Sequence, residues 1–242
     1  MMKRFFDTLL SLAGLIFLSP LILFFAFAVY VQDFHSPFYV ANRVGRGGKP
    51  FRMIKLRSMI IDADKSGVAS TSNDDKRITK VGHLIRRLKL DELVQLFNVV
   101  KGDMSLVGPR PNVQVETDLY SSEEKRLLTV RPGITDFSSI VFSDEGRILE
   151  GKEDPDLSYN QLIRPGKGYL GLFYIDNHSL LLDVKLILLT VVAIASRDRA
   201  LKIIVNELRE LNAPDFILEI ASREKSLVPL PPPGMDEIIT ER

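Results

Sequence analysis

The chain has no cysteine, only three histidines and almost no net charge, and each shortage excludes a class of function. Without cysteine it can form neither a disulfide framework nor a thiolate nucleophile, which is compatible with a cytosol-facing body. His35, His83 and His178 show no metal-ligand spacing, and no Ser-His-Asp set can be built around them. A formal net charge of +1 argues against a nucleic-acid binder that relies on a large basic field.

One long segment lacks charge altogether. Residues Leu9 to Val31 are mostly Leu, Ile, Phe, Ala and Val. A straight helix over this range would be roughly 35 Å long, enough to cross a bilayer core of about 30 Å. Ser19-Pro20 lies in its middle, where proline removes a backbone hydrogen bond and the serine hydroxyl can satisfy the freed carbonyl.

Basic residues flank this segment on both sides: Lys3 and Arg4 before it, and Arg43, Arg46 and Lys49 after it. Because positive charge favours the cytoplasmic side, this pattern favours a re-entrant helix that breaks at Ser19-Pro20 and returns. A proline-kinked spanning helix remains an equal alternative from hydropathy and charge. A cleavable signal peptide is a third alternative, since Ala26-Phe27-Ala28 resembles a cleavage site.

The segment that follows predicts a β-hairpin. Residues 38–40 and 51–59 have strand-like composition and enclose the glycine-rich turn 44–50. That turn lacks the spacing of a phosphate-binding loop, so we interpret it as a plain hairpin turn. Lys55 and Arg57 fall on one strand face and could form a cationic wall, although a solvated strand edge fits equally well.

Farther along, residues 62–80 are polar and indicate a loop, and Ile78 to Val100 predicts a helix in two pieces that breaks near Lys89-Leu90. Residues 112–129 predict another helix, with its start signalled at Ser121.

Residues 180–195 form a second hydrophobic segment, but Asp183 and Lys185 interrupt it. The clean remainder of about ten residues is too short to span a bilayer, so an interfacial or core helix is expected. Residues 198–226 have a charged helical pattern, and 229–234 resemble polyproline.

The stretch with the most chemical character is residues 86–111. An acid pair, Asp91-Glu92, follows a basic run that includes Arg86, and the stiff tripeptide Pro109-Arg110-Pro111 comes later. Two prolines fix the backbone on either side of the arginine, which suits a guanidinium that must face a fixed anion. Arg131, held by the following Pro-Gly, could also contact an anion, or its turn could be an ordinary connector.

Adjacent acids on a helix point about 100° apart, so Asp91 and Glu92 are not a facing acid-base pair. They can take different roles: one attacks or binds metal while the other moves a proton or holds the geometry. Aspartate attack on phosphorus is known nucleophilic chemistry, and Lys55, Arg86 and Arg110 would spread the developing charge. On residue types alone, a solvated acidic first helical turn is the better explanation of the pair.

Taken together, the motifs resemble the bacterial sugar transferase family, the monotopic phosphoglycosyl transferases that begin polyprenol-linked glycan assembly. The resemblance covers about residues 2 to 195. Its motifs occur in family order: KRFFD, the Ser19-Pro20 break, RVGRGGKPF, KLRSM, LDELVQLFNVVKGDMSLVGPRP, RPGIT and LLLDVKLILLT. The chain departs from the family in having Lys89 where Ser or Thr is frequent, and Asp136 where glycine is common.

The resemblance implies transfer of a sugar-1-phosphate from a UDP-sugar to polyprenol (undecaprenyl) phosphate, with release of UMP. It implies that Asp91 is the nucleophile and an Mg²⁺ ligand, and that Glu92 is its dyad partner. It also implies that the cations which meet the diphosphate are Lys55, Arg57, Arg86 and Arg110, and Arg131 is added as a candidate from its turn. The Ser19-Pro20 break then implies a re-entrant helix at the cytoplasmic face of a bacterial inner membrane.

The expected fold class is therefore a membrane-associated, monotopic α/β protein. We expect a re-entrant helical hairpin over 1–32, a small, mainly helical catalytic domain with one β-hairpin and interfacial amphipathic helices over 33–196, and a charged helix with a proline-rich tail over 197–242. The tail is expected to contact protein, either a second copy or a downstream glycosyltransferase.

Two rival interpretations accompany this one. In the first, transfer is a single displacement and Asp91 only holds Mg²⁺. In the second, the chain is a non-catalytic, membrane-anchored scaffold for glycan assembly. No position in the sequence identifies the sugar.

Overall fold

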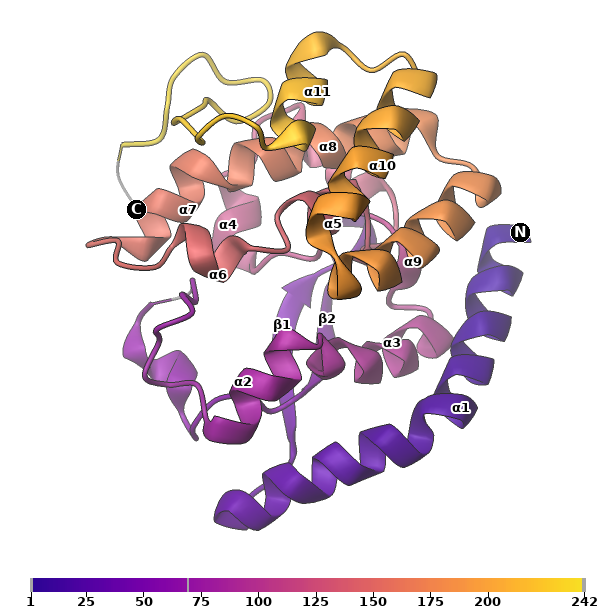
Figure 1. The fold of residues 1–242 in the computed structure, drawn as a ribbon, viewed down its shortest axis with the longest axis vertical. Coiled ribbons are helices and arrows are strands. Elements are labelled where there is room, and N and C mark those ends of the chain that lie inside the picture. Colours follow the sequence, from indigo (N-terminus) through magenta and orange to yellow (C-terminus); the bar gives the residue numbers. More distant parts are fainter. Residues whose placement is uncertain (1, 69, 241–242) are drawn as a thin grey trace.

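The computed structural model describes residues 2–68 and 70–240, which form a mainly helical protein with two small two-stranded sheets (Figure 1). The first half contains α1 (Met2–Asp33), β1 (Phe38–Val44), β2 (Pro50–Leu56), α2 (Lys80–Arg87), α3 (Leu96–Lys101), β3 (Ser105–Val107) and α4 (Gln114–Asp118). The second half contains β4 (Gly133–Thr135), α5 (Phe137–Val141), α6 (Glu145–Ile148), α7 (Pro155–Leu162), α8 (Arg164–Asn177), α9 (Leu180–Ala195), α10 (Arg197–Glu210) and α11 (Asp215–Ser222). Short 3₁₀ turns are η1 (Arg46–Gly48), η2 (Ala63–Ser66), η3 (Leu90–Gln95) and η4 (Glu124–Thr129).

Helix α1 is long and apolar, and it bends sharply near its middle (Figure 1). Pro20 lies inside the helix and leaves the carbonyl of Ile16 without its usual N–H partner. The Ser19 hydroxyl donates to that carbonyl at 2.8 Å, as the sequence predicts for this serine. Within the described residues, α1 is the one helix long and apolar enough to cross a membrane, and only 22% of its most apolar stretch is buried.

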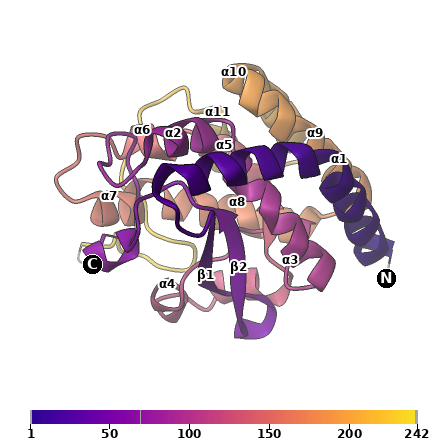
Figure 2. The same cartoon turned by 90° about the horizontal axis from the view of Figure 1, so that it is seen from below.

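The N-terminal half of α1 is fastened to the protein by polar side chains. Lys3 pairs with the buried carboxylate of Asp183 at 2.5 Å, which connects α1 to α9. Asp7 is also buried, and it accepts hydrogen bonds from the Ser105 hydroxyl at 2.8 Å and the Leu106 N–H at 3.3 Å. These contacts place the start of α1 beside α9 and β3, and Figure 2 shows α1 and α9 side by side.

The C-terminal half of α1 packs through apolar side chains. Ile22, Ala26 and Val29 form a small hydrophobic cluster with residues from β2, α2 and η3, including Leu56 and Ile85. The opposite side of the helix is exposed; its large apolar residues there include Phe17, Leu23, Phe24 and Phe27. A buried stripe opposite an exposed apolar stripe is the arrangement expected for a helix that lies between protein and lipid.

Strands β1 and β2 pair antiparallel, with Phe38 opposite Leu56 and Val44 opposite Pro50, so the predicted hairpin is confirmed. The turn contains η1, where Gly47 has a φ of 70° that glycine adopts without strain. The predicted break near Lys89-Leu90 is also confirmed. Helix α2 ends at Arg87, Lys89 takes the left-handed conformation with φ 53°, and the chain re-enters as the 3₁₀ turn η3 before α3.

The second sheet joins two motifs that are distant in sequence. Strand β3 precedes the Pro-Arg-Pro segment, and β4 belongs to the Arg-Pro-Gly segment; they pair parallel, Ser105 with Gly133 and Val107 with Thr135. Backbones approach so closely here that a Cβ on Gly133 would lie 2.1 Å from the Gly108 nitrogen. The glycines of both motifs are therefore required by this contact.

Residues 112–129 differ from the single helix expected. The range divides into α4 and η4. Ser121 and Glu124 exchange two hydrogen bonds, from the Glu124 N–H to the Ser121 hydroxyl at 3.0 Å and from the Ser121 N–H to the Glu124 carboxylate at 3.1 Å. The predicted start signal at Ser121 is thus a capping box, but it begins a new turn after the break rather than one continuous helix.

The main core lies among α5, α8, α9, α10 and β3. Helix α10 contributes Ala200, Ile204 and Leu208, all at 0% exposure, so this part of the expected C-terminal extension belongs to the same core. The tail after α11 folds back on the chain, where the Pro233 carbonyl accepts a hydrogen bond from Ser121 at 2.5 Å.

Helix α9 was expected to be either an interfacial helix or a core helix, and it has one side of each kind. Leu182, Leu186 and Leu189 are buried in the core, whereas Leu181, Leu188 and Val191 are exposed. The described part of the chain is thus a mixed helical protein with one long apolar N-terminal helix and small sheets, consistent with a membrane-associated α/β protein.

Candidate active site

An open cavity of about 960 Å³ lies between the hairpin, α2 and η3 on one side and α5 to α8 on the other. Among the described residues, nine lysines and arginines line it against four carboxylates. The cations are Arg43, Lys55, Lys80, Arg86, Arg87, Lys89, Arg110, Lys167 and Arg197, and the acids are Asp91, Glu92, Glu116 and Glu145. A cleft with this surplus of positive charge attracts polyanions such as diphosphates.

Asp91 lies in the first turn of η3 and faces the cavity. Its carboxylate is 3.7 Å from the Lys55 ammonium, and no hydrogen bond reaches it from the residues the structure describes. Burial raises the pKa of Asp91 above its ordinary value, while Lys55 acts in the opposite direction. The oxygens of this carboxylate are therefore available for an incoming electrophile or cation.

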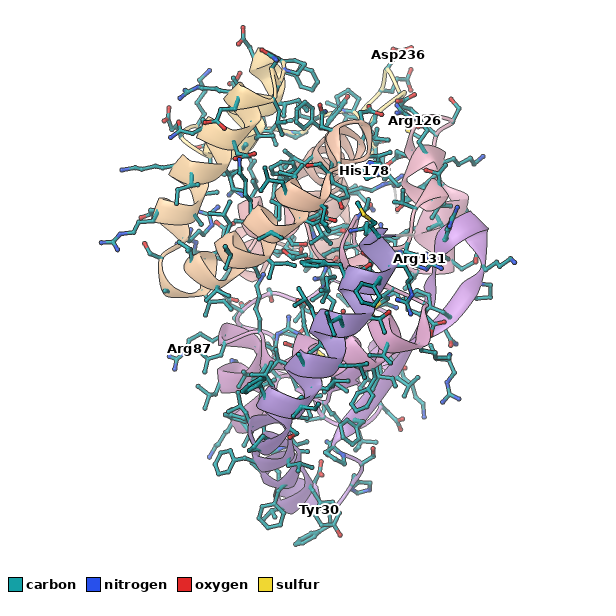
Figure 3. The ribbon with its side chains drawn as sticks, turned by 90° about the vertical axis from the view of Figure 1, so that its right-hand side faces the viewer. Tyr30, Arg87, Arg126, Arg131, His178 and Asp236 are labelled. Atoms are coloured by element: carbon teal, nitrogen blue, oxygen red, sulfur yellow. The ribbon has the colours of Figure 1, made fainter. Side chains whose placement is uncertain are left out.

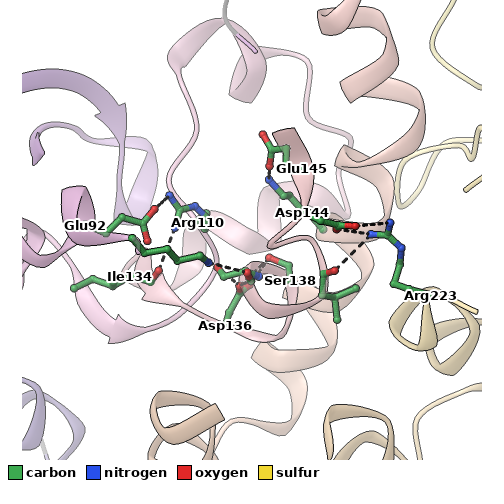
Figure 4. A network of polar contacts seen from close by, with 12 residues as sticks. Glu92, Arg110, Ile134, Asp136, Ser138, Asp144, Glu145 and Arg223 are labelled. Atoms are coloured by element: carbon green, nitrogen blue, oxygen red, sulfur yellow. Dashed lines mark hydrogen bonds and ion pairs between the residues drawn. The ribbon is translucent and has the colours of Figure 1, made fainter. Parts of the chain in front are cut away.

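Glu92 is held more firmly. The Arg110 guanidinium donates to its carboxylate at 2.6 Å (Figure 4). The Lys55 ammonium lies 4.0 Å from the same carboxylate. Burial alone would raise the pKa of Glu92, but Arg110 and Lys55 outweigh it and hold that pKa well below its usual range. The adjacent acids thus share one lysine and differ in availability: Glu92 is a fixed anion, and Asp91 is the less constrained group.

Arg110 is positioned by the β3–β4 pair. It follows β3 within the Pro-Arg-Pro tripeptide, and it also donates to the Ile134 carbonyl of β4 at 3.2 Å (Figure 4). Its contact with Glu92 keeps the pKa of Arg110 above the ordinary value despite burial, so it stays a cation. Sequence reasoning anticipated a rigid arginine, and the structure adds the second motif that supports it.

Lys89 connects the acid pair to the far wall. Its ammonium donates to the Ser139 carbonyl of α5 at 3.2 Å, and burial lowers its pKa. Asp136, the other departure from the family pattern, is fully buried; its carboxylate accepts the Ser139 N–H at 2.7 Å and caps α5. Both departures therefore stabilise the α5 wall of the cavity.

The predicted cations divide into two groups. Lys55, Arg86 and Arg110 line the cavity with Asp91 and Glu92.

Arg57 and Arg131 are not among the described residues that line it. Arg57 follows Leu56, the last residue of β2. Because Arg57 lies outside the strand, the alternation of side chains along a strand no longer places it on the same face as Lys55. Arg57 is buried and pairs with Asp33 at 2.6 Å. Arg131 donates to the Gly102 carbonyl at the end of α3, at 2.9 Å. Figure 3 shows Arg131 across the molecule from Arg87, which lines the cavity. The expected cationic wall of Lys55 with Arg57 is thus not formed.

Several cavity residues were not singled out from the sequence. Glu145 pairs with Lys167, and burial raises the pKa values of Glu116 and Tyr159 on the same wall. Arg197 completes this side. They come from short helices far apart in the chain, so no local pattern in the sequence signalled that they meet.

A divalent cation would find two carboxylates here, Asp91 and Glu92. The described residues contain no cluster of three or more His, Cys, Asp or Glu side chains arranged to hold a metal ion. Mg²⁺ nevertheless commonly takes one or two carboxylates and completes its shell with water and substrate phosphates. The available oxygens of Asp91 fit that mode of binding.

Comparisons with known proteins identify the family. Residues 1–197 match the family described as "Bacterial sugar transferase". The "Exopolysaccharide production protein ExoY" of Sinorhizobium fredii is 36% identical over 207 residues, which cover 79% of this chain and 84% of that protein.

Two further relatives carry substrates in their names. The "UDP-glucose:undecaprenyl-phosphate glucose-1-phosphate transferase" of Caulobacter vibrioides is 34% identical over 201 residues, covering 82% of this chain and 71% of that protein. The "UDP-N-acetylgalactosamine-undecaprenyl-phosphate N-acetylgalactosaminephosphotransferase" of Aeromonas hydrophila is 34% identical over 197 residues, covering 78% of this chain and 42% of that protein. These two names share a lipid acceptor and differ in the sugar.

Proposed function

Because the chain belongs to the bacterial sugar transferase family, we propose that it transfers a sugar-1-phosphate from a UDP-sugar to polyprenol (undecaprenyl) phosphate and releases UMP. The observation that carries the proposal is the Asp91 carboxylate in a cationic cavity, beside Lys55 and the Glu92–Arg110 pair. The product would be the first lipid-linked intermediate of a membrane glycoconjugate.

In the first step, an Asp91 oxygen attacks the phosphorus that carries the sugar. The bond from that phosphorus to the bridging oxygen breaks, and UMP leaves with the electron pair. The phospho-sugar is then held on Asp91 as an acyl-phosphate. Lys55, Arg86 and Arg110 line the cavity and stabilise negative charge that develops on the phosphoryl oxygens.

In the second step, a phosphate oxygen of the polyprenol phosphate attacks the same phosphorus. The bond to the Asp91 oxygen breaks, which restores the carboxylate and gives the polyprenol diphospho-sugar. Glu92 does not need to move during either step, because Arg110 holds it at 2.6 Å. Its role is to fix Arg110 and Lys55 around Asp91.

Mg²⁺ would be held by Asp91 together with substrate phosphate oxygens, and it would supply charge neutralisation for the diphosphate. Removal of divalent ions with EDTA should therefore stop UMP release, and added Mg²⁺ should restore it. Full UMP release in EDTA would remove the metal from the proposal.

The proposed reaction requires a lipid substrate, and α1, which packs against η3, supplies a membrane contact near the cavity. The exposed apolar face of α1 and the apolar side of α9 support a monotopic position, with the bent helix re-entering one leaflet. Basic flanks on both sides of the apolar segment support the cytoplasmic face of the inner membrane.

The decisive experiment uses the full chain in nanodiscs with a panel of UDP-sugars whose sugar phosphate is radiolabelled. With the accepted UDP-sugar and no polyprenol phosphate, label should remain on the protein after denaturation, and Asp91→Asn should abolish it. Asp118→Asn, at an exposed position away from the cavity, serves as the control. UMP release that needs the lipid acceptor and leaves no labelled protein would instead support a single displacement. A panel without any UMP release would support a non-catalytic scaffold.

A further inference from the structure

The cavity has a second polar corner, distinct from the Asp91 side, where α5, α6 and α10 meet. Two buried polar atoms there, the Ser143 hydroxyl and the Arg197 Nε, have no hydrogen-bond partner among the described residues. Both residues line the cavity. A buried donor without a partner costs free energy, so its presence in a cavity wall calls for an explanation, and a bound anion supplies one.

Arg197 is held in position by one of its two terminal nitrogens, Nη2. This nitrogen donates to the Val141 carbonyl at 2.9 Å and to the Asp144 carboxylate at 3.0 Å. Those contacts orient the guanidinium and leave the Nε side unused. The arginine is thus preorganised, which lowers the entropic cost of binding an anion.

The corner also carries surplus positive charge. The Asp144 carboxylate is shared by three arginines: Arg197, Arg147 at 2.9 Å and Arg223 at 3.2 Å (Figure 4 shows the Arg223 contact). One carboxylate cannot neutralise three guanidinium groups.

An apolar surface leads to this corner. On α9, Leu181, Leu188 and Val191 are exposed by 61–67% and lie on one side of the helix. The last turn of the same helix supplies Ala193 and Ile194 to the cavity lining. A ligand with an anionic head and a long apolar tail would place its head in the cationic corner and its tail along the exposed apolar side of α9.

We infer that Arg197 and Ser143 form a second anion subsite, which binds the phosphate of the polyprenol phosphate acceptor while its hydrocarbon chain leaves along the exposed side of α9. This inference rests on the proposed function, because it divides the cavity between two substrates. The UDP-sugar diphosphate occupies the Asp91, Lys55 and Arg110 side, and the acceptor phosphate waits at the α10 side.

The test measures both substrates separately with full-length protein in nanodiscs. Arg197→Met should raise the KM for polyprenol phosphate about tenfold, the cost typical of losing a charge-assisted hydrogen bond, and leave the KM for the UDP-sugar within about twofold. Ser143→Ala keeps the Arg197 contacts and should raise the acceptor KM about threefold. Arg199→Met, exposed in the same helix turn, is the matched control and should change neither KM.

A binding measurement is independent of turnover. Farnesyl phosphate should raise the melting temperature of the wild-type protein and of Arg199→Met, but much less that of Arg197→Met. Farnesol and inorganic phosphate, tested separately, distinguish the tail from the head. An Arg197→Met protein with an unchanged acceptor KM, or with a raised UDP-sugar KM instead, overturns the inference. If no UDP-sugar supports UMP release, the proposed function fails, and farnesyl phosphate binding alone then decides the subsite.

Discussion

Arg110 and Arg57 have the same charge and each binds one carboxylate at 2.6 Å, yet they belong to different parts of the molecule. Arg110 lies on the cavity wall with Glu92. Arg57 joins the end of α1, at Asp33, to the loop before β1 by donating to the Ser36 carbonyl at 2.8 Å. The Arg110 side chain keeps 24% of its surface exposed and the Arg57 side chain only 7%. An arginine-carboxylate pair therefore indicates a catalytic or binding site only where it lines a cavity that a substrate can enter.

The comparison predicts that substitutions on the cavity side reduce turnover, whereas substitutions on the Arg57 side reduce stability. Asp91→Asn should have the largest effect, a fall in the rate of UMP release of at least about 10³-fold, because the amide cannot act as the nucleophile. The measurement is UMP release at saturating UDP-sugar, with the melting temperature recorded in parallel. Near-normal UMP release by a folded Asp91→Asn protein would show that Asp91 is not the nucleophile.

Arg110→Met should come next, with a fall in kcat/KM for the UDP-sugar of about 10²-fold, since a preorganised donor to the phosphoryl group is lost and Glu92 is left without its partner. Arg110→Lys keeps the charge but cannot contact both Glu92 and the Ile134 carbonyl, so it should recover only part of the activity. Full activity in the lysine variant would show that charge alone matters here.

Arg57→Met should show the opposite pattern. We expect kcat/KM of the folded protein to stay within about threefold of wild type, because Arg57 does not line the cavity, while the melting temperature falls. Asp33→Asn, which weakens the same pair from the α1 side, should behave alike. If Arg57→Met loses most of its activity while its melting temperature is unchanged, Arg57 has a role in substrate binding after all.

The smallest effect concerns Lys89, which lies at the break between α2 and η3. Its φ of 53° is strained for any residue with a Cβ, so Lys89→Gly should be more stable than Lys89→Ala by about 1 kcal/mol. Both variants lose the bond to the Ser139 carbonyl, so their difference isolates the backbone. Equal stabilities in thermal unfolding would mean that the break relaxes when the side chain is removed.

Local patterns in the sequence predicted local structure well. The hairpin, the proline bend in α1 and the break at Lys89 each depend on a few adjacent residues with strong backbone preferences, and all three occur. The family resemblance is confirmed by the match over residues 1–197, and with it the expectation of a sugar transferase.

Long-range contacts explain what the sequence could not predict. Arg57 and Arg131 have the composition of anion-binding residues, but Asp33 and the Gly102 carbonyl, distant in sequence, take their donors. The α10 residues have a charged helical pattern that did not reveal a buried side, yet one side of the helix completes the core. Arg197 and Ser143 carried no signal because their neighbours in the cavity come from other helices. The roles of Asp91, Glu92 and Mg²⁺ in catalysis remain predictions for the experiments above.

The polar contacts at the start of α1 have a consequence for how the protein is made. Lys3 pairs with Asp183, which is 180 positions later in the chain. At translation rates of about 5–20 residues per second, the ribosome needs roughly 10–40 s to synthesise that partner after α1. During this interval the apolar helix has no folded surface to cover it, so the bilayer is the environment that can shelter it. We therefore expect membrane insertion to precede folding of the rest of the chain, with the emerging domain assembling on a helix already in lipid.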